Sequence, residues 1–230
     1  MNDVLERHYE LIVMSLIVGL LLVAAFDGTS PATTPQSSAV TLHDLAWTIR
    51  YSPGMRAHPL PQETGGWYFD FPTAPGSVHY VTAAVNMVVS KSVSADIEVR
   101  TTGAPTFEYA LEANNTCVNP ARVRLLLQQK GDDLSGARGK QYYRWWSINA
   151  AYELAPGSTT LTAQVSDLSQ WVSIWGERAD ATAAATAGFW GAMNNLGAVG
   201  FSFGGGCFYG HGVRVSGGGA RFAVTSYKVE

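Results

Sequence analysis

The sequence has little cysteine and little charge, and both shortages narrow its possible functions. Its 230 residues include only two cysteines, Cys117 and Cys207, which are too few for a small domain built on disulfide bonds. Charged residues make up 14% of the chain and the formal net charge is −3. We therefore expect no nucleic-acid partner, because binding to phosphate requires a basic surface.

The sequence also lacks the short motifs of several enzyme classes. It contains no His-Glu-x-x-His motif, and its five histidines show no spacing typical of metal ligands. Its Gly-x-Ser-x-Gly match at 200–204 lies within a stretch that predicts a strand, not at the strand-to-helix elbow that hydrolases require. Its acidic residues are scattered, so no carboxylate pair for glycoside hydrolysis can be assigned. These absences favour a protein without catalytic activity and leave a hydrolase as a weaker alternative.

A continuous apolar run, residues 11–26, dominates the start of the chain. It predicts a signal peptide or a signal-anchor helix over residues 1–26, with membrane contact through residues 11–26. Arg7 precedes the run and the next basic residue after it is Arg50, so we expect the bulk of the chain to be periplasmic or extracellular. The protein would then be either membrane-anchored or secreted, depending on cleavage. Residues 27–40 are rich in Pro, Ser and Thr, which is typical of a flexible linker.

The pattern from 41 to 230 predicts a single all-β domain. Short apolar stretches alternate with polar residues and are separated by Gly, Pro and Asn. Trp67 and Phe69 alternate with Tyr68 in one such stretch. This pattern predicts a two-sheet antiparallel sandwich. An alanine-rich segment predicts one short helix near 182–196.

The C-terminal third carries a resemblance to a known fold. It contains a Trp-bearing stretch at 170–176, helical spacing over 189–196, Gly-Phe-Ser-Phe-Gly-Gly at 200–205 and a last strand over 220–229. This order resembles the galactose-binding-like jelly roll, which includes bacterial carbohydrate-binding modules. The resemblance implies a jelly-roll sandwich that binds a glycan outside the cytoplasm without turning it over. The alternative is a structural or assembly protein of the cell envelope or surface, whose sandwich docks another protein.

A polar loop that runs into an aromatic strand, residues 131–146, offers the best candidate site. Aromatic faces cover the apolar side of a sugar ring, and Arg and carboxylate groups bind its hydroxyls. Strand alternation places Tyr143 and Trp145 on the face opposite to Arg144. The alternative is that Trp146 and Tyr142 line the sandwich interior while Tyr143 and Trp145 cover a loop. The predicted ligand-binding residues are Asp132, Asp133, Tyr143, Arg144, Trp145 and Trp190.

Two further predictions concern metal and disulfide bonds. The resemblance implies that a structural calcium ion is possible, with Asn114, Asn115, Asp132 and Asp133 as weak candidate ligands, although polar turns explain them as well. We expect no other cofactor. In an oxidising compartment Cys117 and Cys207 could form a disulfide bond, or they could be two separate buried thiols.

Overall fold

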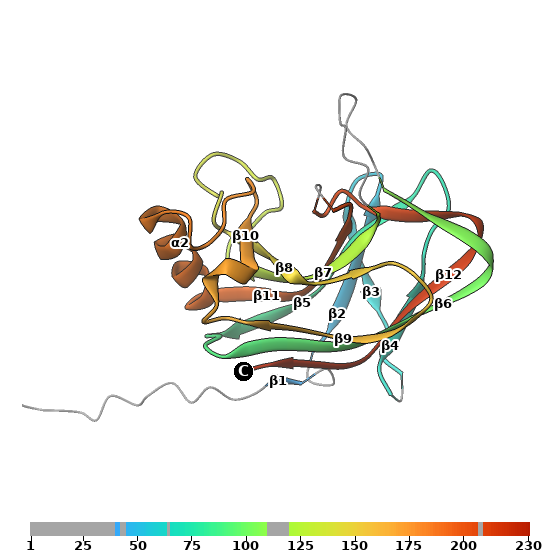
Figure 1. Cartoon of the computed structure of the whole chain (residues 1–230), viewed down its shortest axis with the longest axis horizontal. Coiled ribbons are helices and arrows are strands. Elements are labelled where there is room, and N and C mark those ends of the chain that lie inside the picture. The colour runs from blue at the N-terminus through green and yellow to red at the C-terminus, as the bar shows by residue number, and fades with distance from the viewer. Residues whose placement is uncertain (1–39, 42–44, 64, 110–119, 207–208) are drawn as a thin grey trace, which may run out of the picture. The chain divides into compact units, whose positions relative to one another are not determined.

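Antiparallel strands form most of the computed structural model, which describes residues 40–41, 45–63, 65–109, 120–206 and 209–230 (Figure 1). These residues belong to the unit Ser37–Glu230. The strands are β1 (Val40–Thr41), β2 (Trp47–Ser52), β3 (Arg56–Leu60), β4 (Trp67–Asp70), β5 (Ser77–Met87), β6 (Ser92–Tyr109), β7 (Arg122–Gln129), β8 (Arg144–Glu153), β9 (Gly157–Gln164), β10 (Trp171–Ser173), β11 (Leu196–Gly204) and β12 (Val213–Val229). A 3-10 turn, η2 (Leu168–Gln170), and the helix α2 (Ala183–Met193) complete the described elements.

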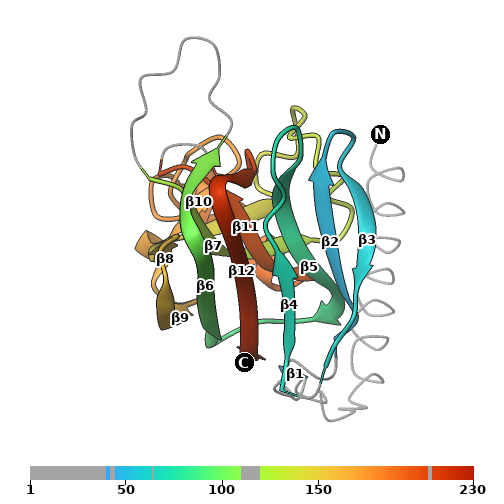
Figure 2. The ribbon, with the colours of Figure 1, turned by 90° about the vertical axis from the view of Figure 1, so that its right-hand side faces the viewer.

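The strands form two layers. The larger layer has the order β3-β2-β5-β11-β7-β8-β10. In the smaller layer, β12 lies between β6 on one edge and β4 and β1 on the other, and β9 pairs with β6 (Figure 2). One residue pair, Val213 with Val78, joins the two layers through β12 and β5. The predicted all-β antiparallel sandwich is therefore confirmed.

An aromatic core fills the space between the layers. In β4 the pattern is as predicted, because Trp67 and Phe69 are buried while Tyr68 and Asp70 are exposed. From the facing strands, Phe203 of β11 meets Phe222 of β12 at 5.1 Å between ring centroids, edge to face. Such contacts stabilise a core beyond the area that they bury. The buried rings that meet here are Trp47, Trp67, Phe69, Phe71, Phe201, Phe203, Phe222 and Tyr227.

The predicted short helix is α2, and it packs on the core. Thr182 caps its start, because the hydroxyl oxygen accepts a hydrogen bond from the Ala185 N–H at 3.1 Å. Phe189, Ala192 and Met193 are buried against the sandwich. The helix thus covers one end of the core, where its Phe189 meets Trp145 of β8.

Some of the sequence predictions fall on residues that the structure does not describe. These are the signal or anchor segment 1–26, most of the linker 27–40, the calcium candidates Asn114 and Asn115, and the tentative disulfide pair Cys117 and Cys207. Among the described residues, the structure contains no helix of the length and apolarity that crossing a membrane requires.

Candidate ligand-binding cleft

The outer face of the larger layer carries a second apolar cluster in addition to the core. Its buried members are Tyr80, Leu126, Trp146 and Val172, from β5, β7, β8 and β10. We call them the outer-face cluster. Ile148 of β8 and four loop side chains pack against this cluster; the loop residues are Met55, Leu134, Ile174 and Tyr209. The outer face is therefore partly covered by loops, and polar side chains placed there by strand alternation are buried as well.

Arg144 and Asp132 form a buried ion pair on this outer face. Arg144 Nε donates to Asp132 Oδ2 at 2.8 Å and Nη2 donates to Oδ1 at 2.9 Å. The two side chains are only 4% and 1% exposed. Two parallel hydrogen bonds of this kind fix both position and orientation. Arg144 Nη1 also donates to the Tyr80 hydroxyl at 3.3 Å, so the pair is tied to the central strands.

The Asp132 carboxylate also anchors the 130–143 loop, which connects β7 to β8. Its oxygens accept hydrogen bonds from the Gln128 side chain at 2.8 Å and from the Leu134 N–H at 3.0 Å. Burial opposes ionisation of Asp132, but the hydrogen bonds and charge of Arg144, helped by Gln128 and Leu134, lower its pKa. The ionised Asp132 carboxylate thus stabilises the loop conformation, and its oxygens accept hydrogen bonds from N–H donors of the protein rather than from a ligand.

Asp133 is exposed and stabilises the same loop locally. Lys140 Nζ donates to Asp133 Oδ2 at 2.7 Å, and the Ser135 N–H and hydroxyl donate to Oδ1. These interactions, that of Lys140 first, lower the pKa of Asp133. Tyr143 is half-buried, with the Lys140 ammonium 5.9 Å from its ring centroid.

The prediction that Trp145 contacts a ligand is wrong, because none of its side chain is exposed. Trp145 pairs with Leu127 in the β7–β8 register and points into the core. Its ring stacks on Tyr142 at 5.8 Å and meets the edge of Phe189 at 5.2 Å. Its Nε1–H donates to the Tyr142 carbonyl at 2.8 Å, so the polar atom is satisfied internally. The alternative interpretation is wrong as well, because Trp145 lies in the core rather than over a loop and Trp146 lies in the outer-face cluster rather than in the interior.

The other predicted residues are only partly brought together. Asp132, Asp133, Tyr143 and Arg144 meet at the 130–143 loop, whereas Trp190 lies on α2. Trp190 is half-buried and packs edge-on against Phe189 at 5.4 Å.

The described residues of the loop do not fit the calcium site that the resemblance implied. The Asp132 oxygens already face a guanidinium group, an amide and a backbone N–H. A cation placed there would be repelled by Arg144. Within the described ranges, no group of three or more His, Cys, Asp or Glu side chains is placed to hold a metal ion.

The most exposed large apolar side chain in the described part of the chain is Trp175, at 57%. It stands at the tip of a tight hairpin that follows β10, in which Gly176 N–H donates to the Ser173 carbonyl at 3.0 Å. Gly176 has a φ of +79°, a conformation that glycine adopts without strain. The indole is held in place, because its Nε1–H donates to the Gly136 carbonyl at 3.2 Å.

Beside Trp175 lies a cleft of about 280 Å³, which we call the Trp175 cleft. It is lined by Trp146, Ser173, Ile174, Trp175, Gly176, Tyr209 and His211. Trp146 and Tyr209 meet at 5.6 Å between ring centroids on its floor. The Trp146 Nε1–H is buried and has no hydrogen-bond partner. The lining thus combines the exposed Trp175 ring, the half-buried Tyr209 ring and the buried Trp146 ring with its unsatisfied donor.

The sequence pattern did not identify Trp175 as a site residue, because it predicts one strand over 170–175. Continued alternation would place Trp171, Ser173 and Trp175 on the same buried face. In the structure β10 ends at Ser173, and the hairpin turns Trp175 outward. The signal available in the sequence was Gly176, a turn residue directly after the tryptophan.

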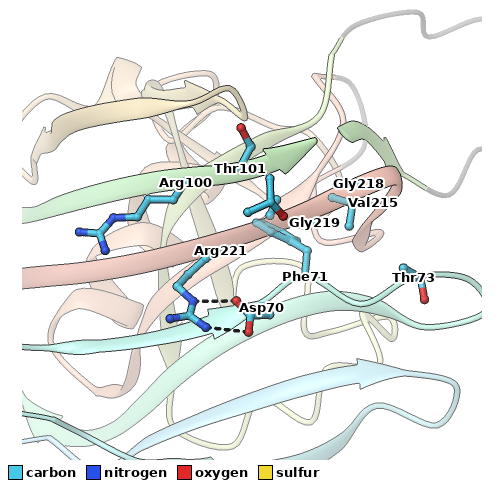
Figure 3. A pocket seen from close by; sticks show the side chains of 11 residues that line it. Asp70, Phe71, Thr73, Arg100, Thr101, Val215, Gly218, Gly219 and Arg221 are labelled. Atoms are coloured by element: carbon cyan, nitrogen blue, oxygen red, sulfur yellow. Dashed lines mark hydrogen bonds and ion pairs between the residues drawn. The ribbon is translucent and has the colours of Figure 1, made fainter. Parts of the chain in front are cut away.

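A larger hollow of about 530 Å³ lies on the smaller layer (Figure 3). Asp70 and Arg221 face each other there in a two-bond ion pair, at 2.7 and 2.9 Å. Arg100, which also lines the hollow, pairs with Glu98. Phe71 is the one aromatic residue among its described lining residues, and it is buried in the core. This hollow therefore offers no open ring face, and we favour the Trp175 cleft as the binding site.

Comparisons with known proteins assign no family and no role to this chain. No family model matches the chain, and no curated protein matches it. Among solved structures, the chain is similar to a xylan-binding module CBM15, with a TM-score of 0.39 and 10% sequence identity over 81% of this chain and 96% of that chain. No residue role is transferred at this level of similarity.

Proposed function

We propose that the sandwich domain binds a glycan without turning it over, and that a sugar ring lies against Trp175 in the cleft. The observation that carries this proposal is the indole of Trp175, which is 57% exposed and is held by its own hydrogen bond beside the Trp175 cleft. A ring fixed in this way loses little side-chain entropy when a ligand covers it.

The chemistry of the cleft fits a sugar. An indole face covers the apolar C–H side of a pyranose, while the His211 imidazole, the Ser173 hydroxyl and the Trp146 N–H lie near its polar groups. At about 280 Å³ the cleft lies at the small end of ligand pockets, which suits one ring of a longer chain. The described lining residues supply rings and neutral polar groups rather than a pair of carboxylates, which favours binding over hydrolysis.

The proposal includes a location outside the cytoplasm. It is supported by the apolar run 11–26 and by the Pro-, Ser- and Thr-rich segment that follows it. A periplasmic or extracellular domain on such a linker would meet envelope or environmental glycans.

The test is a glycan array probed with the purified full chain and with two variants. Trp175→Ala removes the proposed platform, and Tyr68→Ala serves as a control because Tyr68 is an exposed ring on the smaller layer. We expect the wild type and Tyr68→Ala to bind the same glycans and Trp175→Ala to lose them.

Two results would overturn the proposal: absence of binding to any glycan, or unchanged binding by Trp175→Ala. An exposed tryptophan also anchors protein interfaces. If no glycan binds and the wild type captures one discrete envelope protein that Trp175→Ala does not, the assembly function replaces the glycan-binding one.

A further inference from the structure

Arg124, on the outer face of the larger layer, is a buried cation without an anionic partner. Its side chain comes from β7, and the residue is 3% exposed. Its Nη1 donates to the carbonyls of Ser147 at 3.3 Å and Ile148 at 3.0 Å. No carboxylate of the described residues lies within ion-pair distance of its guanidinium group. Burying a charge in this way is costly unless a partner compensates for it.

Arg144, on the neighbouring strand, shows what is missing at Arg124. Arg144 donates hydrogen bonds to the Asp132 carboxylate from Nε and Nη2, the two nitrogens on one edge of its guanidinium group. In Arg124 the Nε is buried without a partner, and neither Nε nor Nη2 donates to a described residue. The Nε and Nη2 edge that binds a carboxylate in Arg144 therefore has no described hydrogen-bond acceptor in Arg124.

Three further buried polar atoms without partners lie on the same face, namely Arg122 Nε, Ser202 Oγ and Trp146 Nε1. Ser202 of β11 is the register partner of Arg124, and its Oγ makes no hydrogen bond. Trp146 of β8 is the register partner of Leu126, and its Nε1–H is also unsatisfied. Buried polar groups in native proteins nearly always have partners, so an unsatisfied set in one place calls for an explanation such as a ligand.

Tyr209 connects this set to the Trp175 cleft. Its ring lies over Arg124, with the guanidinium carbon 4.3 Å from the ring centroid, and the same ring lines the cleft beside Trp146. Arg124 and the cleft therefore share one half-buried neighbour, the Tyr209 ring.

The charges around Arg124 favour an anion. Arg122 lies two residues earlier on the same face of β7, and burial together with the charge of Arg122 lowers the pKa of Arg124 although Tyr209 acts in the opposite direction. Glu153 is opposite Arg122 in the strand register, but no ion pair joins it to Arg122 or Arg124 among the described residues. Asp132, the carboxylate that the described part of the chain buries on this face, is already bound to Arg144.

From these contacts we infer that the Trp175 cleft takes an acidic sugar, a uronic acid residue whose carboxylate binds the open Nε and Nη2 edge of Arg124. This inference rests on the proposed glycan binding and specifies its ligand class. The sugar ring covers Trp175, and the Tyr209 side chain turns aside so that the carboxylate reaches the guanidinium group. The Ser202 hydroxyl and the Trp146 N–H then lie where they can bind neighbouring oxygens.

The test uses calorimetry of the full chain with three forms of one oligosaccharide: the galacturonate, its methyl ester and a sulfated counterpart. We expect the wild type to bind the galacturonate roughly tenfold or more tightly than the ester, since hydrogen bonds to charged groups exceed neutral ones. Arg124→Gln should bind the galacturonate and the ester alike. Arg221→Gln, which changes an arginine of the smaller layer, should keep the wild-type preference.

Measurements on the wild type alone keep the inference testable if Arg124→Gln does not fold. Binding of the galacturonate should weaken between low and high salt, whereas binding of the methyl ester should not. Equal affinity for the acid and the ester would overturn the acidic ligand while leaving glycan binding intact. Preference for the sulfated form would overturn the carboxylate. Failure of all three forms, together with an empty glycan array, would overturn both proposals.

Discussion

The indole Nε1–H of Trp175 donates a hydrogen bond to the carbonyl oxygen of Gly136, 3.2 Å away. This bond joins the hairpin after β10 to the 130–143 loop. The loop is in turn fastened by Asp132 to Arg144 on β8. A buried ion pair therefore helps to orient Trp175, the large ring most open to solvent among the described residues.

The first prediction separates binding from stability at Trp175. Trp175→Ala should change the free energy of unfolding by about 0.5 kcal/mol or less, because exposed side chains contribute little to stability, yet it should abolish glycan binding. Trp175→Phe keeps a ring face but loses the hydrogen bond to Gly136. Its affinity for the glycan should therefore lie between those of the wild type and of Trp175→Ala. Urea unfolding and calorimetry measure these effects. Loss of the fold in Trp175→Ala would show that the ring is structural.

The second prediction concerns Trp145, which is sealed in the core. Trp145→Ala should destabilise the domain by about 3–5 kcal/mol, because it removes a large ring and leaves a cavity. Trp190→Ala, in a half-buried ring of α2, should cost clearly less. Thermal unfolding of both variants provides the comparison. A small effect at Trp145 would contradict its placement between Tyr142 and Phe189.

The third prediction is that Asp132 stabilises the fold through Arg144. Asp132→Asn should cost about 3–5 kcal/mol at neutral pH, because it leaves the buried Arg144 charge without its partner. The matched change Asp133→Asn should have a much smaller effect, since Asp133 is exposed.

The pH dependence of this effect has a definite sign. The pKa of Asp132 is lowered in the folded state, so its contribution is complete above the ordinary carboxyl pKa of about 3.9 and is lost as pH falls through the folded pKa. The difference in unfolding free energy between wild type and Asp132→Asn should thus be constant from about pH 5 to 8 and shrink in acid. Urea titrations across this range measure it. A difference in unfolding free energy between the two proteins that grows in acid would contradict the ion pair.

The fourth prediction compares two glycines of α2. Alanine is ordinarily favoured over glycine in a helix by about 1 kcal/mol. At Gly191 an added Cβ meets nothing within 4 Å, so Gly191→Ala should be stabilising. At Gly188 the added Cβ would lie 2.4 Å from the Tyr142 ring, which is stacked on Trp145, so Gly188→Ala should be destabilising. Thermal melts that shift in the same direction for both variants would refute this packing.

Local patterns were enough to predict the fold class and several elements. The alternation of Trp67 and Phe69 with Tyr68 and Asp70 predicts their faces correctly, because β4 is short and regular. The alanine-rich segment likewise predicts α2, which the Thr182 cap begins. Both features depend on neighbours along the chain, and the 2.0 and 3.6 periodicities record such neighbours directly.

The candidate site was predicted less well, because alternation separates Trp145 from Arg144 and Trp146 but does not say which face of β8 meets the core. Extrapolating the alternation back from Trp145 to Tyr143 assumed that both lie in one strand. In the structure β8 begins at Arg144, and Tyr142 comes back to stack on Trp145. The pairing of Arg144 with Asp132 and with Tyr80 joins residues 12 and 64 positions apart, which no local pattern records.

By itself, therefore, the sequence determined the all-β class, the alternating faces of regular strands and the place of α2, since these follow from local periodicity. Only the tertiary structure decided which rings are open, because burial depends on which loops cover a face. Trp145 is enclosed by Tyr142 and Phe189, and Trp175 is turned outward after β10 ends at Ser173. The cleft exists because β8, the hairpin after β10 and the segment that begins at Tyr209 converge on one face of the larger layer.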